Sequence, residues 1–200
     1  MIKKICVFCG SSKPKNNSKI EREVSKMVKI FFEKKIELIY GGASIGLMGQ
    51  ISNNLFDLGG KVTGVIPKVL STKEIINKNI TDLIIVKNMH ERKKKMYDLS
   101  DAFIVLPGGV GSMDELLEVM VSNQLGGINK PLGVLNTNGY YDSFINWLQR
   151  SVDDQFVSIE NQNQVLVSDS PKTLLEMILI AEMPSEDTWI NRLNVDFHKD

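Results

Sequence analysis

The sequence predicts an α/β protein built as one domain: a Rossmann-like, doubly wound parallel sheet with helices on both faces. Two observations carry this prediction. Short, nearly continuous runs of Ile, Val and Leu are typical of strands that are covered on both sides, as parallel strands are. These runs alternate with longer segments of helical periodicity, which is the order expected when each parallel strand is joined to the next by a helix.

The individual elements follow from these patterns. Strands are predicted at Lys4–Phe8, Glu37–Tyr40, Lys61–Ile66, Leu83–Val86, Ala102–Leu106 and Leu132–Leu135, with a weaker one at Gln164–Val167. Helices are predicted at Ser18–Lys35, Gly46–Leu58, Glu91–Leu99, Ser112–Leu125, Tyr141–Val152 and Pro171–Ala181. No repeat or linker interrupts the alternation, so residues 1–183 are predicted to form one domain and residues 184–200 a polar C-terminal tail.

Charge and length narrow the classes of function. The 200 residues include 24 Lys and Arg and 24 Asp and Glu, so the formal net charge is zero at pH 7. A general nucleic-acid or membrane-surface binder depends on a basic excess, so we expect neither partner and favour a small ligand held in one pocket. The apolar run near the N-terminus is too short for a signal peptide or a membrane span, which predicts a cytoplasmic location.

The cysteines do not predict chemistry. Cys6 and Cys9 have the C-x-x-C spacing of a redox pair, but such a pair usually opens a helix. Here Cys6 falls within a predicted strand and Cys9 at its end, so the two side chains are expected on different faces. Two histidines and two cysteines, scattered along the chain, also predict no metal site.

The loops after the strands are where a ligand is expected, because open parallel sheets bind ligands beyond the carboxyl ends of their strands. Small residues follow the first two strands, and Gly10, Ser11, Gly41 and Gly42 are candidates for a phosphate-binding loop. Two known nucleotide signatures are absent. Asp114 stands where G-x-G-x-x-G needs its third glycine, and no G-x-x-x-x-G-K-[ST] occurs, which disfavours a dinucleotide-dependent dehydrogenase and a P-loop NTPase.

The most informative segment is Leu106–Glu115, which joins a predicted buried strand to a predicted helix. Its glycines and the helix start form a phosphate cradle, since free backbone N–H groups and the positive end of the helix dipole point at one place. Two acidic residues, Asp114 and Glu115, lie beside that place. Anions beside a phosphate site need either a chemical role or cations that offset them.

Two interpretations of these acids stay open from the local sequence. The structural one is that Ser112 and Glu115 match the capping box S-x-x-E, while Asp114 suits the first turn of a helix. The chemical one starts from Glu118, which lies one turn further on. Three crowded carboxylates tend to raise the pKa of one of them, as in acid–base sites. The roles of Asp114 and Glu118 are left open.

Basic residues near the start of the helix after the fourth strand favour the chemical interpretation. Arg92 and Lys93 stand where a cation opposes the helix dipole, so a purely structural helix would not favour them. Lys94 and Lys95 are interpreted as a solvated face. His90 is either a general acid or a hydrogen-bonding strut, and the second role is the commoner one for such a loop histidine.

Taken together, these segments resemble one family. Met89-His90-Glu91-Arg92-Lys93, Ser100-Asp101-Ala102-Phe103 and Pro107-Gly108-Gly109-x-Gly111-Ser112-x-x-Glu115 are similar to the LONELY GUY (LOG) family, whose signature is PGGxGTxxE with an upstream MHERK. The resemblance covers roughly residues 1–180. Members are cytokinin riboside 5′-monophosphate phosphoribohydrolases. Many bacterial members also hydrolyse AMP, and older descriptions call them lysine decarboxylases.

The resemblance implies roles for particular residues. Arg92 and Glu115 match the catalytic pair of the family. Its nucleotide-binding positions are matched by Glu74, Arg92, Lys93, Gly109, Val110, Gly111, Ser112, Met113, Asp114 and Glu115. There are three departures: Ser112 replaces a Thr and keeps the hydroxyl, Asp114 replaces a Glu, and Val121 replaces a Thr that touches the ligand in plant members.

The reaction that the resemblance implies is hydrolysis of the N-glycosidic bond of AMP or N6-modified AMP. Glu115 would stabilise the oxocarbenium-like state or activate water. Arg92 would hold the phosphate or orient Glu115, and the loop from Gly108 to Ser112 would bind the 5′-phosphate through N–H groups. No metal or organic cofactor is required. The shorter members of the family imply a homodimer.

Two other functions are kept as alternatives. A non-catalytic nucleotide-binding or carrier protein could share the fold, although the retained Arg92–Glu115 pair favours the enzyme. Decarboxylation of lysine would need a Schiff-base lysine for pyridoxal phosphate, and no lysine is singled out for it. The base is also open. Met89, Met113 and Val121 point to an apolar-lined site that suits plain and prenylated AMP, although Met89 could equally fill the core.

Overall fold

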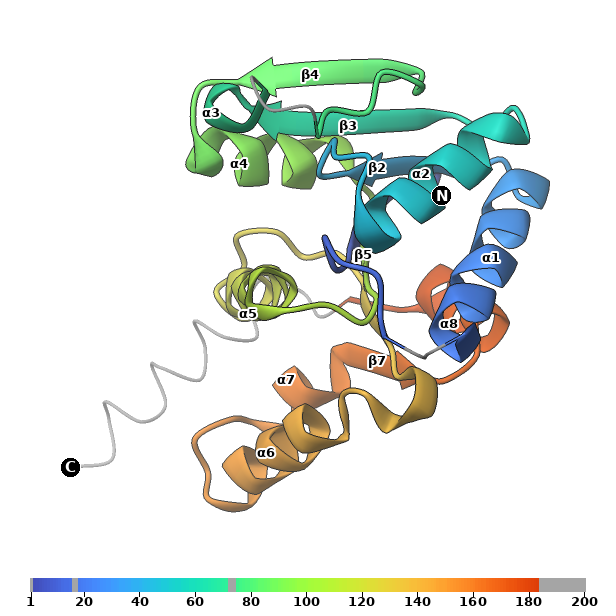
Figure 1. Cartoon of the computed structure of the whole chain (residues 1–200). Coiled ribbons are helices and arrows are strands. Elements are labelled where there is room, and N and C mark those ends of the chain that lie inside the picture. Colours follow the sequence, from blue (N-terminus) through green and yellow to red (C-terminus); the bar gives the residue numbers. More distant parts are fainter. Residues whose placement is uncertain (1, 16–17, 72–74, 184–200) are drawn as a thin grey trace.

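The computed structural model describes residues 2–15, 18–71 and 75–183, and in this part of the chain helices cover both faces of one parallel sheet (Figure 1). The strands pair in the order β4-β3-β2-β1-β5-β6-β7, and each pairing within the sheet is parallel. The predicted α/β, doubly wound fold is therefore confirmed. The predicted tail at residues 184–200 and the site candidate Glu74 lie outside the described residues.

The strands agree with the predicted ones to within one residue at each end, including the weaker last one. Their bounds are β1 Lys4–Phe8, β2 Glu37–Tyr40, β3 Val62–Pro67, β4 Asp82–Val86, β5 Ala102–Val105, β6 Leu132–Leu135 and β7 Val165–Ser168. Ile5 to Phe8 in β1 are all buried, and so is the whole of β5. Burial on both sides explains why these segments read as continuous apolar runs.

The long helices also follow the prediction, but the short ones were missed. Their bounds are α1 Ser18–Glu33, α2 Gly46–Asp57, α3 Lys68–Ser71, α4 Met89–Leu99, α5 Val110–Gln124, a 3₁₀ turn η1 Thr137–Gly139, α6 Asp142–Asp153, α7 Ile159–Asn163 and α8 Pro171–Ile180. The elements α3, α7 and η1 have five residues or fewer, which is too short to show a helical period. No helix within the described residues has the length and apolar character needed to cross a bilayer.

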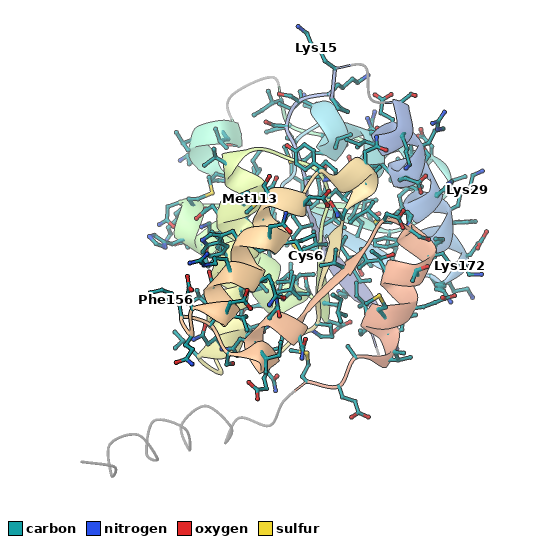
Figure 2. The ribbon with its side chains drawn as sticks, turned by 90° about the horizontal axis from the view of Figure 1, so that it is seen from below. Cys6, Lys15, Lys29, Met113, Phe156 and Lys172 are labelled. Carbon is teal, nitrogen blue, oxygen red and sulfur yellow. The ribbon has the colours of Figure 1, made fainter. Side chains whose placement is uncertain are left out.

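Two apolar cores lie on opposite faces of the sheet. One is formed with α1, α2 and α8, through Val24, Met27, Phe31, Leu47, Ile51, Leu55, Leu174 and Ile178. The other is formed with α4, α5 and α6, through Met96, Leu116, Val119, Phe144 and Leu148. Cys6 belongs to the second core and lies in the interior of the molecule (Figure 2), whereas Cys9 belongs to the first. The two thiols are free and buried, and they lie on different faces of the sheet as the strand pattern predicts.

The direction in which the sheet is wound reverses between β1 and β5. From β1 the sheet extends through β2 and β3 to β4, and from β5 it extends the other way through β6 to β7. At such a switch point the loops after the two central strands diverge and leave a crevice. The Gly10 N–H donates to the Pro107 carbonyl at 3.1 Å, which ties the two loops together at the floor of this crevice.

Candidate active site

A cavity of about 260 Å³ lies at the switch point, where the loops after β1, β2 and β5 meet. Its charged lining is Arg92 from α4 and Glu115 from α5. The complete lining is Val7, Phe8, Cys9, Gly10, Ser11, Gly41, Met48, Arg92, Met96, Gly109, Val110, Gly111, Ser112 and Glu115. The cavity thus combines a glycine loop, an apolar wall and one pair of opposite charges.

Arg92 is positioned by the start of α4. This helix begins at Met89, two residues before the predicted start, because the Asn88 side chain accepts a hydrogen bond from the Glu91 N–H at 2.9 Å. The Glu91 carboxylate in turn accepts from the Lys87 N–H at 2.9 Å. These two hydrogen bonds cap the N-terminus of α4, and Arg92 lies at the end of the first turn of this helix.

The Arg92 guanidinium is held by three groups. Nη1 donates to Glu115 Oε1 at 3.1 Å and contacts the Met89 sulfur at 3.4 Å, while Nε donates to the Val65 carbonyl at 3.2 Å. Gly41 provides the space, because a Cβ at that position would lie 2.2 Å from Arg92 Nη2. Arg92 is therefore fixed against the end of β3, with one edge turned to Glu115.

Ser112 and Glu115 do not form the capping box that their spacing predicts. Helix α5 begins at Val110, two residues earlier than expected, and its N-cap Gly109 has no side chain. The Gly109 carbonyl accepts from the N–H groups of Ser112 and Met113 at 3.1 and 3.2 Å, so the backbone alone closes the first turn. Ser112 consequently lies inside the helix, and Glu115 is free to pair with Arg92.

Burial dominates the behaviour of the Glu115 carboxyl. Its side chain is 10% exposed. Burial raises the pKa of Glu115, and the neighbouring Asp114 charge adds to this rise; the positive charges of Arg92 and Lys93 oppose it without cancelling it. A buried carboxyl with a raised pKa, in a cavity and beside a cation, is suited to proton transfer or to stabilising a positive charge in a ligand.

Lys93 holds the other two carboxylates of α5. Its ammonium donates to Asp114 at 2.7 Å and also to Glu118. Burial lowers the pKa of Lys93, but the hydrogen bonds and charges of its two partners outweigh burial, so the net pKa is raised and the ammonium stays charged. The three crowded carboxylates are thus divided between two cations, with Glu115 on Arg92 and the other two on Lys93.

The glycine loop leaves room for a ligand at its backbone. A Cβ on Gly109 or Gly111 would meet nothing within 4 Å, so a ligand could approach these peptide groups closely. Gly108 differs, because a Cβ there would lie 2.1 Å from Ser112 Oγ. Gly108 is required for packing of the loop on α5, whereas Gly109 and Gly111 border open space.

The structure brings most of the predicted site residues to this cavity. Those that line it are Gly10, Ser11, Gly41, Arg92, Gly109, Val110, Gly111, Ser112 and Glu115. Those that do not are Gly42, Met89, Lys93, Gly108, Met113 and Asp114. Gly42 is buried against Ile66, and Met113 packs into the core beside α5. His90 is exposed on α4 and also lies outside the lining.

The apolar lining of the cavity differs from the predicted one in two ways. Val121 lines a separate apolar cavity of about 110 Å³ between α5, α6 and α7, not the one that holds Arg92 and Glu115. Sequence patterns missed Phe8, Met48 and Met96 as lining residues. Met48 comes shortly after the loop that follows β2, and this position could have identified it as a lining residue. Phe8 and Met96 have the sequence pattern of ordinary core residues, so no signal pointed to them.

The open parallel sheet, with a cavity at its switch point that is lined by glycines and an ion-paired glutamate, defines a Rossmann-like α/β protein with a candidate ligand site. Residues 48–178 match the family described as "Possible lysine decarboxylase". The chain is 40% identical over 191 residues to cytokinin riboside 5′-monophosphate phosphoribohydrolase LOG2 of Arabidopsis thaliana, covering 96% of this chain and 89% of the relative. With LOG4 of the same plant it shares 44% identity over 165 residues, which cover 82% of this chain and 76% of that protein. The chain belongs to this LOG family of phosphoribohydrolases, which are hydrolases.

Solved structures with the same fold are more distant in sequence. The molybdenum cofactor carrier protein from Chlamydomonas reinhardtii superposes with a TM-score of 0.66 at 17% identity, covering 90% of this chain and all (100%) of that one. The molybdenum cofactor binding protein from Rippkaea orientalis gives a TM-score of 0.63 at 17% identity over 88% of this chain and 93% of the other. At this level of identity the likeness shows the fold alone.

Proposed function

We propose that the protein hydrolyses the N-glycosidic bond of adenosine 5′-monophosphate and of its N6-modified forms. The products are the free adenine or cytokinin base and ribose 5-phosphate. The observation that carries the proposal is the ion pair between Arg92 Nη1 and Glu115 Oε1, 3.1 Å long, in a cavity that also exposes the glycine loop. The names of the relatives at about 40% identity agree with this chemistry.

The phosphate and the reacting bond are assigned to two sides of the cavity. The backbone from Gly109 to Gly111, at the positive end of the α5 dipole, is the place for the 5′-phosphate. Glu115 lies one turn further along the same helix, so it faces the ribose of a nucleotide bound in this way. The apolar wall, with Met48 and Met96, is left for the base.

Glu115 and Arg92 carry the reaction in this proposal. The C1′–N9 bond breaks with a build-up of positive charge on the ribose, which an ionised Glu115 stabilises at close range. The same carboxylate takes a proton from the water that adds to C1′, and transfer of this proton to the departing base returns Glu115 to its ionised form. Arg92 holds Glu115 in place and draws the pKa of Glu115 down from the value that burial alone would give.

Lysine decarboxylation, which the family description mentions, does not fit the residues. Such an enzyme holds pyridoxal phosphate as a Schiff base on a lysine, which must lose its proton to react. The lysine next to this cavity is Lys93, whose ammonium is bound by Asp114 and Glu118 and whose net pKa is raised. The Lys93 ammonium therefore stays charged and bound to two carboxylates, which does not suit a Schiff-base lysine.

The proposal is tested by incubating the purified protein with AMP, isopentenyladenosine 5′-monophosphate and adenosine, and separating the products by liquid chromatography. Equal amounts of free base and ribose 5-phosphate from one or both nucleotides are expected. Adenosine should react more slowly because it lacks the phosphate. Binding of both nucleotides without release of base would indicate a carrier instead.

We further propose a homodimer that works in the cytoplasm. Val110, Leu117, Val121 and Leu125 are exposed along one face of α5, and Val110 is 88% exposed. Large exposed apolar side chains aligned on one helix are typical of a protein–protein contact. The two unbonded cysteines agree with a reducing compartment.

A further inference from the structure

Two adjacent tyrosines each donate a hydrogen bond to one backbone carbonyl in the loop after β5. The Tyr140 hydroxyl donates to the Gly108 carbonyl at 2.5 Å, and the Tyr141 hydroxyl donates to the Leu106 carbonyl at 2.8 Å. The tyrosines lie between β6 and α6, and their rings meet edge to face with centroids 5.0 Å apart. The loop after β6 is thereby joined to the loop after β5.

The turn that presents these tyrosines is itself fixed. The Asn136 side chain accepts from the Tyr141 N–H at 2.7 Å and donates to the Asp142 carboxylate at 2.8 Å. Gly139 has a φ of +67°, and a Cβ there would lie 2.3 Å from Asp142 Oδ2, so a side chain at this point of the turn would strain the backbone and displace Asp142. These contacts hold the turn from which both tyrosines reach the loop after β5.

The Tyr140 bond determines where one loop N–H points. A trans peptide unit directs its C=O and its N–H in opposite directions, and the described chain contains no cis peptide bond. The Gly108 carbonyl points to Tyr140, so the N–H of Gly109 points away from it. Tyr140 lines a neighbouring cavity of about 440 Å³ and not the cavity of Arg92 and Glu115, whereas Gly109 lines both.

The Gly108–Gly109 peptide unit needs such a support because glycines flank it on both sides. Without side chains, Gly108 and Gly109 allow a wider range of ψ and φ than other residues do, so the unit could turn its N–H away from the ligand. We propose that Tyr140 is a positioning residue, which holds the Gly109 N–H toward the Arg92–Glu115 cavity so that it donates to the 5′-phosphate. This inference rests on the proposed function for the identity of the ligand.

Tyr141 provides a matched control, because the carbonyl that it binds belongs to a peptide unit without an N–H group. The Leu106 carbonyl shares its peptide unit with the nitrogen of Pro107, which carries no hydrogen. Tyr141 is 3% exposed, and burial raises the pKa of its hydroxyl, which therefore stays protonated as a donor. Loss of this hydroxyl affects packing of the loop but not the direction of a phosphate-binding N–H.

The test compares Tyr140→Phe and Tyr141→Phe, each combined with Glu115→Gln so that the ligand is not consumed. Affinities for AMP and for adenosine are measured by isothermal titration calorimetry. Tyr140→Phe is expected to weaken AMP binding about fivefold, the effect of one hydrogen bond, while adenosine binding changes less than twofold. Tyr141→Phe is expected to lower the melting temperature and to leave the ratio of the two affinities unchanged.

Kinetics give a second readout on proteins that keep Glu115. The KM for AMP should rise in Tyr140→Phe while kcat stays within twofold of the parent. Equal losses for AMP and adenosine, an unchanged AMP affinity, or the same phosphate-selective loss in Tyr141→Phe would overturn the inference. If the parent binds AMP but releases no base, the proposed function fails, whereas the affinity ratio still decides the role of Tyr140.

Discussion

Glu115 combines two properties that suit a catalytic carboxylate. It is buried, which raises its pKa, and it contacts the Arg92 guanidinium at 3.1 Å, which keeps the ionised form accessible. A carboxylate in water would be ionised but solvated, and a buried one without a cation would be neutral. The pair therefore gives an anion with little water around it, ready to face positive charge on a ribose.

The pH dependence of kcat follows from the direction of this shift. In the proposed reaction Glu115 acts as the carboxylate. Because its pKa is raised, activity should fall as the pH drops through a value above the ordinary pKa of glutamate, about 4.3. Asp114→Asn removes a charge that raises this pKa, so the acidic limb should move to lower pH. Because kcat reports the bound complex, titration of the free nucleotide phosphate does not confuse the result. A limb that is unmoved in Asp114→Asn would exclude Glu115 as the titrating group.

The geometry of the site depends on strand exits together with the N-terminal turns of α4 and α5, which carry Arg92 and Glu115. The loop after β2 makes room for Arg92 through Gly41, the end of β3 binds its Nε, and the loop after β5 carries the glycines. Each of these positions depends on strand register, which the parallel pairings fix. A small change in a loop should thus affect the site more than the fold.

Gly41→Ala tests this arrangement. The added Cβ would lie 2.2 Å from Arg92 Nη2, and the flexible end of that side chain must move to relieve the clash. We expect kcat/KM to fall about 100-fold, which is the effect of misplacing a reacting group by about 1 Å, while the melting temperature changes by only a few degrees. Gly127→Ala is the control, because its Cβ would meet only the Ser122 carbonyl at 3.4 Å. Full activity in Gly41→Ala would contradict the role given to Arg92.

The sequence was sufficient for the strands but not for the contacts between loops. Continuous apolar runs located each strand to within one residue, since burial on both faces leaves a strong pattern. The capping box at Ser112 was wrong because the N-cap of α5 is a glycine, and a backbone turn leaves no side-chain signature. The bond from Tyr140 to Gly108 joins residues 32 positions apart, and only the order of β5 and β6 in the sheet brings them together.

At the level of the whole molecule, the exposed apolar side chains along α5 support the proposed contact between two copies. Val110, Leu117, Val121 and Leu125 recur at helical spacing and remain exposed, beside the turn that carries Asp114 and Glu118. A second copy covering this face would lie close to Glu115. The net charge of zero imposes no long-range repulsion between two copies.

Val121→Asp tests the homodimer. A charge placed in an apolar contact loses its water without gaining a partner, so the variant should sediment as a monomer where the parent sediments as a dimer. Val121 is 51% exposed, so the isolated chain should tolerate the change, and analytical ultracentrifugation with thermal melting checks both points. Ile180→Asp, on α8 at 80% exposure, should remain dimeric. A monomeric parent at micromolar concentration would rule out the dimer.

In the proposed reaction Glu115, held by Arg92, breaks the N-glycosidic bond of a nucleoside 5′-monophosphate. This role is tested by the rate of free adenine release from AMP by the parent protein and by Glu115→Gln, with AMP affinity and melting temperature measured on both. We expect Glu115→Gln to bind AMP and to remain folded, but to release adenine at least 100-fold more slowly. Release of adenine at the parent rate by Glu115→Gln would contradict the claim.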